Sequence, residues 1–193
     1  MSTKVVYVTG CLGFIGFHVT QACLTQGWYV IGVDKKTYAA NTEFLQDLLD
    51  NDRFRFIESD INDLDMLYDC DYIINTAAET HVDNSIMSSG VFLHSNVNGV
   101  HHLLGLIKQQ PNHKQPILLH FSTDEVYGDI ETGSHIETDL LKPSNPYAAS
   151  KAAADMLILA WARTFQLPYI IVRPTNNYGI GQYIEKFIPT MVT

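Results

Sequence analysis

The stretch KVVYVTGCLGFIG, residues 4–16, joins an apolar run of strand length to a loop that contains three glycines. The segment FIGFHVTQACLTQ (14–26), which overlaps the end of this loop, has the pattern of a helix. Glycines at such a junction permit a tight turn and let the backbone approach a pyrophosphate at the helix N-terminus, where amide groups and the helix dipole favour anions. The stretch therefore predicts a strand, a phosphate-binding turn and a helix in direct succession.

The rest of the chain repeats this alternation of apolar, strand-length runs with helical segments. Strands that alternate with helices form parallel sheets, so we expect an α/β protein with a Rossmann-type doubly wound parallel sheet and helices on both faces. The expected strands are 4–9, 28–34, 53–59, 72–78, 116–123 and 169–174, and the expected helices are 14–26, 42–49, 85–109 and 147–165.

We expect residues 1–193 to form one dinucleotide-binding domain, because the sequence has no repeat, low-complexity segment or linker. The loop 129–146 is polar and rich in turn residues, which favours a mobile flap. The segment IEKFIPTMVT (184–193) stops inside an apolar, helix-like run. This ending favours a longer parent chain that supplies most of the substrate-binding part.

Composition excludes several classes of function. The net charge is −9, from 12 basic and 21 acidic residues, which disfavours binding to nucleic acid or to an anionic membrane. No apolar run approaches the ~20 residues of a membrane helix. The three cysteines, Cys11, Cys23 and Cys70, form no C-x-x-C pair and favour a reducing, cytoplasmic setting. The eight histidines show no metal-binding spacing, so we expect no metal.

An acid follows the second expected strand. Asp34 stands 18 residues after Gly16, near the interval of about 20 at which a carboxylate accepts hydrogen bonds from ribose hydroxyls. Such a carboxylate repels a 2′-phosphate and so favours NAD over NADP. Lys35 and Lys36 weaken that preference, since a cation could pair with the phosphate. The alternative is a purely structural glycine turn with Asp34 as a loop cap.

Further candidates follow the third and fourth strands. Asp60 is expected on the adenine side of the crevice, although it could also be an ordinary acid at a strand end. Small side chains after residue 76 leave room for a cofactor. The candidate cofactor-binding residues are Gly10, Gly13, Phe14, Ile15, Gly16, Asp34, Lys35, Asp60, Ile61, Ala77, Ala78, Thr80, Tyr147 and Lys151.

The last two of these belong to the segment YAASK. Tyr147 and Lys151 are four residues apart and therefore lie on one side of a helix. A phenol with its ordinary pKa near 10 is a poor base at neutral pH, but a nearby ammonium stabilises the phenolate and lowers that pKa. The pair therefore suits removal of a proton from a hydroxyl group while hydride leaves the carbon. An exposed, unrelated pair is the alternative.

Taken together, the segments TGCLGFIG, STDEVYG, NPYAASK and RPTNNYG occur in the order found in the extended short-chain dehydrogenases/reductases. Within that superfamily the chain most resembles the nucleotide-sugar 4,6-dehydratases, and the similarity includes DKKTYAAN (34–41), AAETHVDNSI (77–86) and YIEKFIP (183–189). The residues TDE are the discriminating part, because epimerases and decarboxylases of the superfamily usually carry others there.

The resemblance implies a redox-neutral reaction with retained NAD on dTDP- or UDP-glucose. Tyr147 would take the 4-hydroxyl proton as C4 is oxidised, Glu125 would remove the C5 proton, and Asp124 would protonate the departing 6-hydroxyl. Adjacent carboxyls resist ionising together, so one shared proton would leave one acid and one base. Thr123 would hydrogen-bond the 4-hydroxyl or Tyr147. The candidate catalytic residues are Thr123, Asp124, Glu125, Tyr147 and Lys151.

Substrate contacts are implied for His81, Ser85, Thr123, Asn176, Asn177, Glu185 and Lys186, with helix capping as an alternative for His81 and Ser85. The helices near 90–109 and 147–165 resemble those that pair in the homodimers of the family. We expect a poorly active fragment if the chain is isolated from its parent. Two other functions stay open: a nucleotide-sugar 4-epimerase or decarboxylase, and a non-catalytic dinucleotide-binding module.

Overall fold

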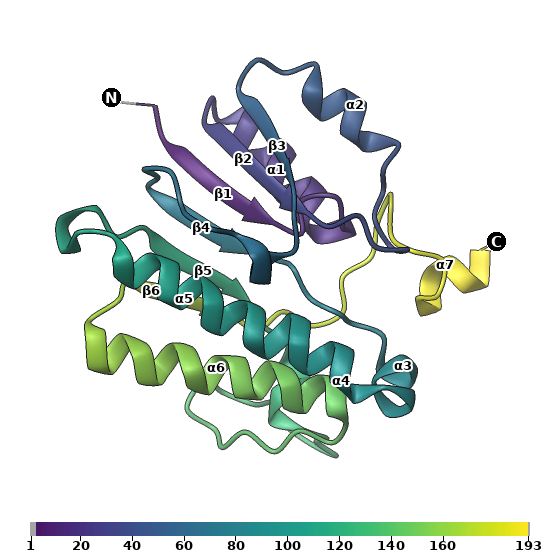
Figure 1. The fold of residues 1–193 in the computed structure, drawn as a ribbon. Helices are drawn as coiled ribbons and strands as arrows, with labels where there is room; N and C mark the ends of the chain where they lie inside the picture. Colours follow the sequence, from purple (N-terminus) through teal and green to yellow (C-terminus); the bar gives the residue numbers. More distant parts are fainter. Residues whose placement is uncertain (1–2, 193) are drawn as a thin grey trace.

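A parallel sheet of six strands forms the centre of the computed structural model, which describes residues 3–192 (Figure 1). The strand order is β3-β2-β1-β4-β5-β6, and every neighbouring pair is parallel. This order confirms the predicted doubly wound fold, in which successive strands are added on one side of β1 as far as β3 and then, from β4 on, on its other side. The strands are β1 (Val5–Thr9), β2 (Tyr29–Asp34), β3 (Phe54–Glu58), β4 (Tyr72–Asn75), β5 (Ile117–Phe121) and β6 (Tyr169–Val172).

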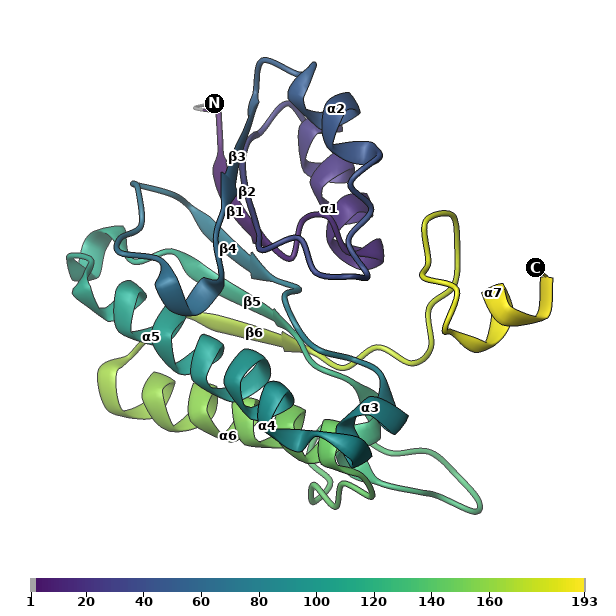
Figure 2. The same cartoon turned by 45° about the vertical axis from the view of Figure 1, so that its right-hand side comes forward.

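Helices cover the sheet from both sides (Figures 1 and 2). On one face α1 (Phe14–Thr25) and α2 (Phe44–Leu49) pack on β1, β2 and β3 through a core that includes Val8, Phe17 and Phe54. On the other face α5 (Gly99–Gln109) and α6 (Pro146–Phe165) enclose a core that includes Tyr7 and Leu103. Within residues 3–192, no helix has both the length and the apolar character needed to cross a membrane.

The remaining helical elements are short. They are α3 (Val82–Met87), α4 (Ser89–Phe92), α7 (Phe187–Val192), the 3₁₀ turns η1 (Ile61–Asp63), η3 (Asn112–Lys114) and η4 (Asp124–Tyr127), and the π-helical η2 (Leu93–Asn98).

The continuous helix predicted over 85–109 is broken in the structure. Ser88 adopts φ −151° and ψ 81°, which ends α3, and the chain restarts as α4 and passes through the π turn into α5. The π turn places the Asn96 amide inside the protein, where its Nδ2 donates to the Glu79 carbonyl at 3.0 Å and to Ser150 Oγ at 2.9 Å. Side-chain bonding of this kind depends on distant parts of the chain, so a local periodicity could not predict the break.

Two helical glycines provide a stability test. A Cβ on Gly16 in α1 would lie 1.9 Å from the Gly10 carbonyl oxygen, whereas a Cβ on Gly105 in α5 would meet nothing within 4 Å. We therefore expect Gly16→Ala to lower the free energy of unfolding by about 1–3 kcal/mol through overpacking. Gly105→Ala is the matched control and is expected to raise it by about 0.5–1 kcal/mol. Urea unfolding measures both, and equal effects would contradict the close approach at Gly16.

Candidate cofactor and substrate site

A cavity of about 290 Å³ opens at the carboxyl ends of the strands, around the reversal point between β1 and β4. Crevices at this position are where doubly wound sheets bind ligands. The lining includes every candidate cofactor-binding residue except Lys151, from the glycine loop to Tyr147. It also includes the candidate catalytic and substrate-binding residues Thr123, Glu125, Asn176, Asn177, Glu185 and Lys186.

The glycine loop is fastened to the end of β2. Gly10 has φ +71°, and a Cβ there would lie 2.8 Å from the Ala77 backbone, so only glycine fits between the loop and the segment after β4. Asp34 accepts hydrogen bonds from the Leu12 amide at 3.0 Å and the Lys36 amide at 2.8 Å. Burial raises the pKa of Asp34 despite these bonds. The carboxylate therefore shapes the loop and also faces the cavity.

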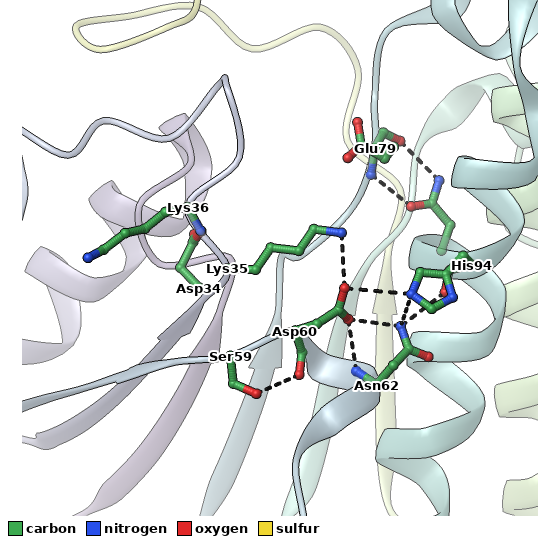
Figure 3. Close-up of polar contacts among 9 residues, drawn as sticks. Asp34, Lys35, Lys36, Ser59, Asp60, Asn62, Glu79 and His94 are labelled. Atoms are coloured by element: carbon green, nitrogen blue, oxygen red, sulfur yellow. Dashed lines mark hydrogen bonds and ion pairs between the residues drawn. The ribbon is translucent and has the colours of Figure 1, made fainter.

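Both lysines after Asp34 are paired with acids, and Figure 3 shows the pair of Lys35 with Asp60. Lys35 Nζ lies 3.0 Å from Asp60 Oδ2, and Lys36 Nζ lies 2.6 Å from Glu58 Oε2. Burial raises the pKa of Asp60, but hydrogen bonds from the Asn62 backbone, the Asn62 side chain and Lys35 outweigh it and lower the pKa overall. Asp60 also caps η1. Because each lysine already has a carboxylate partner, neither is a free cation for a 2′-phosphate.

Glu79 is a cavity residue that the sequence reasoning missed (Figure 3). Its backbone is held from both sides by the Asn96 amide, which accepts from the Glu79 amide at 2.8 Å and donates to its carbonyl. Burial raises the pKa of the Glu79 carboxyl; Lys35 opposes the rise, and Glu185 and Asp60 add to it. The available signal was an acid directly after Ala77 and Ala78, the small pair that follows β4.

The TDE segment leaves the strand and forms η4 directly after β5. Thr123 caps this turn, since its hydroxyl accepts from the Glu125 amide at 3.3 Å. Glu125 Oε2 accepts from Asn145 Nδ2 at 3.0 Å, and Asn145 in turn caps α6 through the Ala148 amide at 2.8 Å. Asn145 therefore fixes the base candidate relative to the Tyr147 helix, a link that the sequence reasoning also missed.

The two carboxyls do not form the proton-sharing pair that the sequence led us to expect. Asp124 Oδ1 lies 3.3 Å from Thr123 Oγ1, while Glu125 has Asn145 as its partner. Asp124 lines a neighbouring groove, and Glu125 lines both that groove and the cavity. The reason is the 3₁₀ geometry: with about three residues per turn, consecutive side chains diverge. If one of the two carboxyls acts as the acid and the other as the base, the difference must come from their different surroundings and not from a shared proton.

The Tyr147–Lys151 pair also differs from expectation. Burial raises the pKa of Tyr147 to about 12, the Glu125 charge adds to the rise, and a hydrogen bond with Thr123 opposes it. Lys151 Nζ donates to the Phe121 carbonyl at 2.6 Å and lies 3.3 Å from His120 Nε2. The predicted lowering of the phenol pKa by the ammonium is therefore wrong for this state, because the lysine is anchored on β5.

His81 and Ser85 take the alternative role of helix capping. His81 Nδ1 accepts from the Asn84 amide at 3.3 Å at the start of α3. The buried Ser85 hydroxyl donates to the Val82 carbonyl at 2.6 Å and accepts from the Tyr147 amide at 3.2 Å. Neither residue is part of the cavity lining, and their role as substrate contacts stays a prediction. Ser85 instead holds the first turn of α6, where Tyr147 stands.

The segment after β6 returns to the cavity rim. Lys186 Nζ donates to the Thr80 carbonyl at 3.0 Å, and burial lowers the pKa of Lys186. The Tyr38 hydroxyl donates to Glu185 Oε1 at 3.4 Å. The Asn177 side chain donates to the Thr175 carbonyl at 2.9 Å. The candidate substrate-binding residues Asn176, Asn177, Glu185 and Lys186 therefore line the cavity, and Lys186 is a partly buried cation at its rim.

Fold and site together define a dinucleotide-binding domain of the short-chain dehydrogenase/reductase class. The family model described as GDP-mannose 4,6 dehydratase matches residues 7–193, and the chain belongs to that family. It is 43% identical to the dTDP-glucose 4,6-dehydratase of Neisseria gonorrhoeae, over 98% of this chain and 59% of that protein. The enzyme of the same name from Streptomyces niveus is 42% identical, over 97% of this chain and 58% of its own length. The chain thus spans about three fifths of the length of these curated relatives.

Solved structures of related enzymes have the same fold as this chain. A double mutant of the dTDP-glucose 4,6-dehydratase from Streptomyces venezuelae, crystallised with NAD, superposes with a TM-score of 0.89 at 39% identity, covering 98% of this chain and 61% of that one. The UDP-glucuronic acid 4-epimerase of Bacillus cereus, with NAD and UDP-glucuronic acid, gives a TM-score of 0.90 at 29% identity, covering 96% and 60%. The scaffold is therefore shared between dehydratases and epimerases, while sequence identity is higher to the dehydratase.

Proposed function

We propose that the intact protein is an NAD-dependent nucleotide-sugar 4,6-dehydratase that converts dTDP- or UDP-glucose to the 4-keto-6-deoxy sugar nucleotide. The observation that carries the proposal is the convergence of Thr123, Glu125 and Tyr147 on the cavity that the glycine loop and Asp34 also line. A proton acceptor for a hydroxyl and a carboxylate base at one site are what oxidation followed by elimination requires. The relatives from Neisseria gonorrhoeae and Streptomyces niveus, at 43% and 42% identity, carry this activity in their names.

The cavity residues fit NAD. The α1 N-terminus and the side-chain-free surface of Gly10 and Gly13 suit a pyrophosphate. Asp34 suits the adenine ribose hydroxyls, and Asp60 and Ile61 suit the adenine side of the crevice. When bound, NAD⁺ supplies the acceptor for hydride from C4 and the source of hydride for C6. Tyr147 and Lys151 would hold the nicotinamide end.

The chain should discriminate strongly between the two dinucleotides. The Asp34 carboxylate beside the glycine loop would repel a 2′-phosphate, and Lys35 and Lys36 are already paired with Asp60 and Glu58. We therefore expect NAD⁺ to bind at least about tenfold more tightly than NADP⁺. Isothermal titration of the 193-residue chain measures this. Asp34→Asn keeps an acceptor oxygen but removes the charge, so it should reduce the ratio of the NAD⁺ affinity to the NADP⁺ affinity. Equal affinity of the unsubstituted 193-residue chain for NAD⁺ and NADP⁺ would contradict the assignment of Asp34.

The residues would divide the chemistry as follows. Tyr147 takes the proton from the 4-hydroxyl, and the resulting ketone acidifies the C5 hydrogen. Glu125 removes that C5 proton. Asp124, which contacts Thr123 and lines the neighbouring groove, would have to turn toward the cavity to donate a proton to the 6-hydroxyl, which then leaves as water. Glu125 then returns a proton to C5. Each positioned proton transfer of this type is worth about 10²–10⁴-fold in rate.

The strongest rival is a nucleotide-sugar 4-epimerase, since an epimerase superposes equally well. An epimerase needs no carboxylate base at C5, so Glu125 in the cavity favours the dehydratase. Incubation of the intact protein with dTDP-glucose and with UDP-glucose, followed by NMR of the product, separates the two. A 4-keto-6-deoxy sugar supports the proposal, and a C4-epimerised hexose refutes it. Cofactor binding with no product would favour a non-catalytic module.

The proposal includes a cytoplasmic homodimer. All three cysteines are free, and Cys11 is fully buried, which suits a reducing compartment. On the outer side of α6, Met156 is 47% and Phe165 is 37% exposed. Trp161 of the same helix is partly buried and packs against the core instead. Analytical ultracentrifugation of the intact protein tests the dimer, and a Met156→Glu substitution should weaken it.

A further inference from the structure

A row of buried polar side chains crosses the sheet below the cavity. Thr9 ends β1, Asn75 ends β4 and His120 lies in β5, and they occupy paired positions of three neighbouring strands. Their exposed fractions are 0%, 1% and 0%. Polar groups cost free energy in a sheet interior unless they are hydrogen-bonded, and apolar residues would fill the same space more cheaply. The row therefore calls for an explanation beyond packing.

The row leads to Lys151. Thr9 Oγ1 lies 2.5 Å from Asn75 Oδ1, Asn75 Nδ2 lies 2.9 Å from His120 Nδ1, and His120 Nε2 lies 3.3 Å from Lys151 Nζ. Lys151 is 2% exposed, and its second contact is the Phe121 carbonyl at 2.6 Å. Its charged neighbour is Asp155, one turn further along α6, and Tyr147 lies one turn earlier. Polar networks of this kind hold their members rigidly when every bond is satisfied.

Donors and acceptors restrict how the row can be arranged. An ammonium has three donors and no acceptor, so it can bond His120 only if Nε2 carries no proton. The ring proton then sits on Nδ1 and needs an acceptor, which the Asn75 amide oxygen supplies after a half-turn of the amide; its nitrogen then donates to Thr9. In the reverse arrangement Thr9 donates to Asn75, Asn75 to Nδ1, and Nε2–H to a neutral amine. The row thus fits both protonation states of Lys151 with opposite bond directions.

We propose that His120, held by Asn75 and Thr9, is a positioning residue for Lys151 whose bare Nε2 accepts a hydrogen bond from the ammonium and keeps it charged and in place near Tyr147. The inference rests on the proposed function, in which Tyr147 takes the hydroxyl proton and Lys151, one helical turn away, helps to hold the nicotinamide end. Its new content is that a histidine outside the cavity lining controls a charge at the site.

The electrostatics support a neutral His120 ring beside Lys151. Burial lowers the pKa of Lys151 to about 8, and the Asp155 charge opposes the fall. Burial and then the Lys151 charge lower the pKa of His120 well below its usual value, so the ring stays neutral and can accept. Burial raises the pKa of Asp155, although Arg173 Nε donates to Asp155 Oδ2 at 2.9 Å. With the Lys151 pKa this close to neutrality, one hydrogen bond to its charged form changes how much charge remains.

The pH profile of the intact protein is the first test. Losing an acceptor disfavours the ammonium and lowers its pKa, so His120→Leu should move the alkaline limb of kcat/KM down by about one pH unit. His120→Gln offers an uncharged oxygen to Lys151 and should keep the limb near its original position. An unmoved limb in His120→Leu overturns the proposal, and so does an equal shift in both variants, because a merely structural role would not separate them.

A second measurement needs neither a variant nor turnover. Long-range proton–nitrogen correlation NMR on the 193-residue chain with isotopically labelled histidine reports the tautomer of His120 directly. Between about pH 6 and pH 7 we expect a neutral ring with Nδ1 protonated and Nε2 bare, and a reversal as Lys151 loses its proton. Protonated Nε2 at the lower pH overturns the inference even if the enzyme is active. The expected tautomer in a protein without dehydratase activity would instead refute only the proposed function.

Discussion

Replacing Glu125 with glutamine is expected to lower formation of the 4-keto-6-deoxy sugar by about 10²–10⁴-fold while leaving NAD binding unchanged. Glutamine has the same shape, and its amide oxygen can still accept from Asn145 Nδ2, which Glu125 Oε2 does at 3.0 Å. The substitution therefore removes the base and keeps the contact with the α6 cap. Product NMR measures the rate, and titration calorimetry measures the cofactor affinity.

The control for this variant is Asp129→Asn, which also removes one negative charge close to η4. Asp129 lines the neighbouring groove and is not part of the cavity lining. It should leave turnover within about twofold, because a surface charge contributes little. Unchanged turnover in Glu125→Gln would remove Glu125 as the base. Equal losses in both variants would indicate that net charge, not proton transfer, is responsible.

Replacing Tyr147 with phenylalanine should abolish the reaction at its first step. The substitution removes only the hydroxyl group, and the ring keeps its edge contact with the Phe92 ring, whose centroid lies 6.4 Å away. Loss of a positioned base costs about 10²–10⁴-fold, and a C4 that is never oxidised also leaves the C5 hydrogen unacidified. Both turnover and hydrogen exchange at C5 should be lost together. Persistent C5 exchange in this variant would contradict the assigned order of steps.

The fold was largely predictable because its signals are local. The glycine loop, the acid 18 residues later and the apolar strand-length runs each depend on neighbouring residues. The cavity then followed from topology, since parallel strands deliver their carboxyl ends to one edge. The fourth strand was predicted too long: β4 ends at Asn75, and both the backbone amide and the hydroxyl of Thr76 donate to the Thr9 carbonyl.

Side-chain directions were not predictable in the same way. Sequence spacing placed Tyr147 and Lys151 on one helix side, but only the packed structure shows that the Phe121 carbonyl captures the lysine. Adjacent positions for Asp124 and Glu125 suggested one shared proton, and a single 3₁₀ turn separates their partners. Distant partners decided each of these cases.

The structural roles of Ser85 and Asn145 were not predictable for the same reason. Ser85 lies in a segment that resembles a substrate-binding one, yet its hydroxyl donates to the Val82 carbonyl and accepts from the Tyr147 amide. Asn145 was noted only as part of the segment NPYAASK, although it links the start of α6 to Glu125. A polar side chain can cap or bind, and the choice depends on what lies opposite.

The most direct test is to run the intact protein with dTDP-glucose in deuterium oxide and to locate the label by NMR. If Glu125 removes the C5 proton and water leaves across C5 and C6, the product is a 4-keto-6-deoxy sugar nucleotide with deuterium at C5. A product that is epimerised at C4 and carries no deuterium at C5 would contradict elimination at this site.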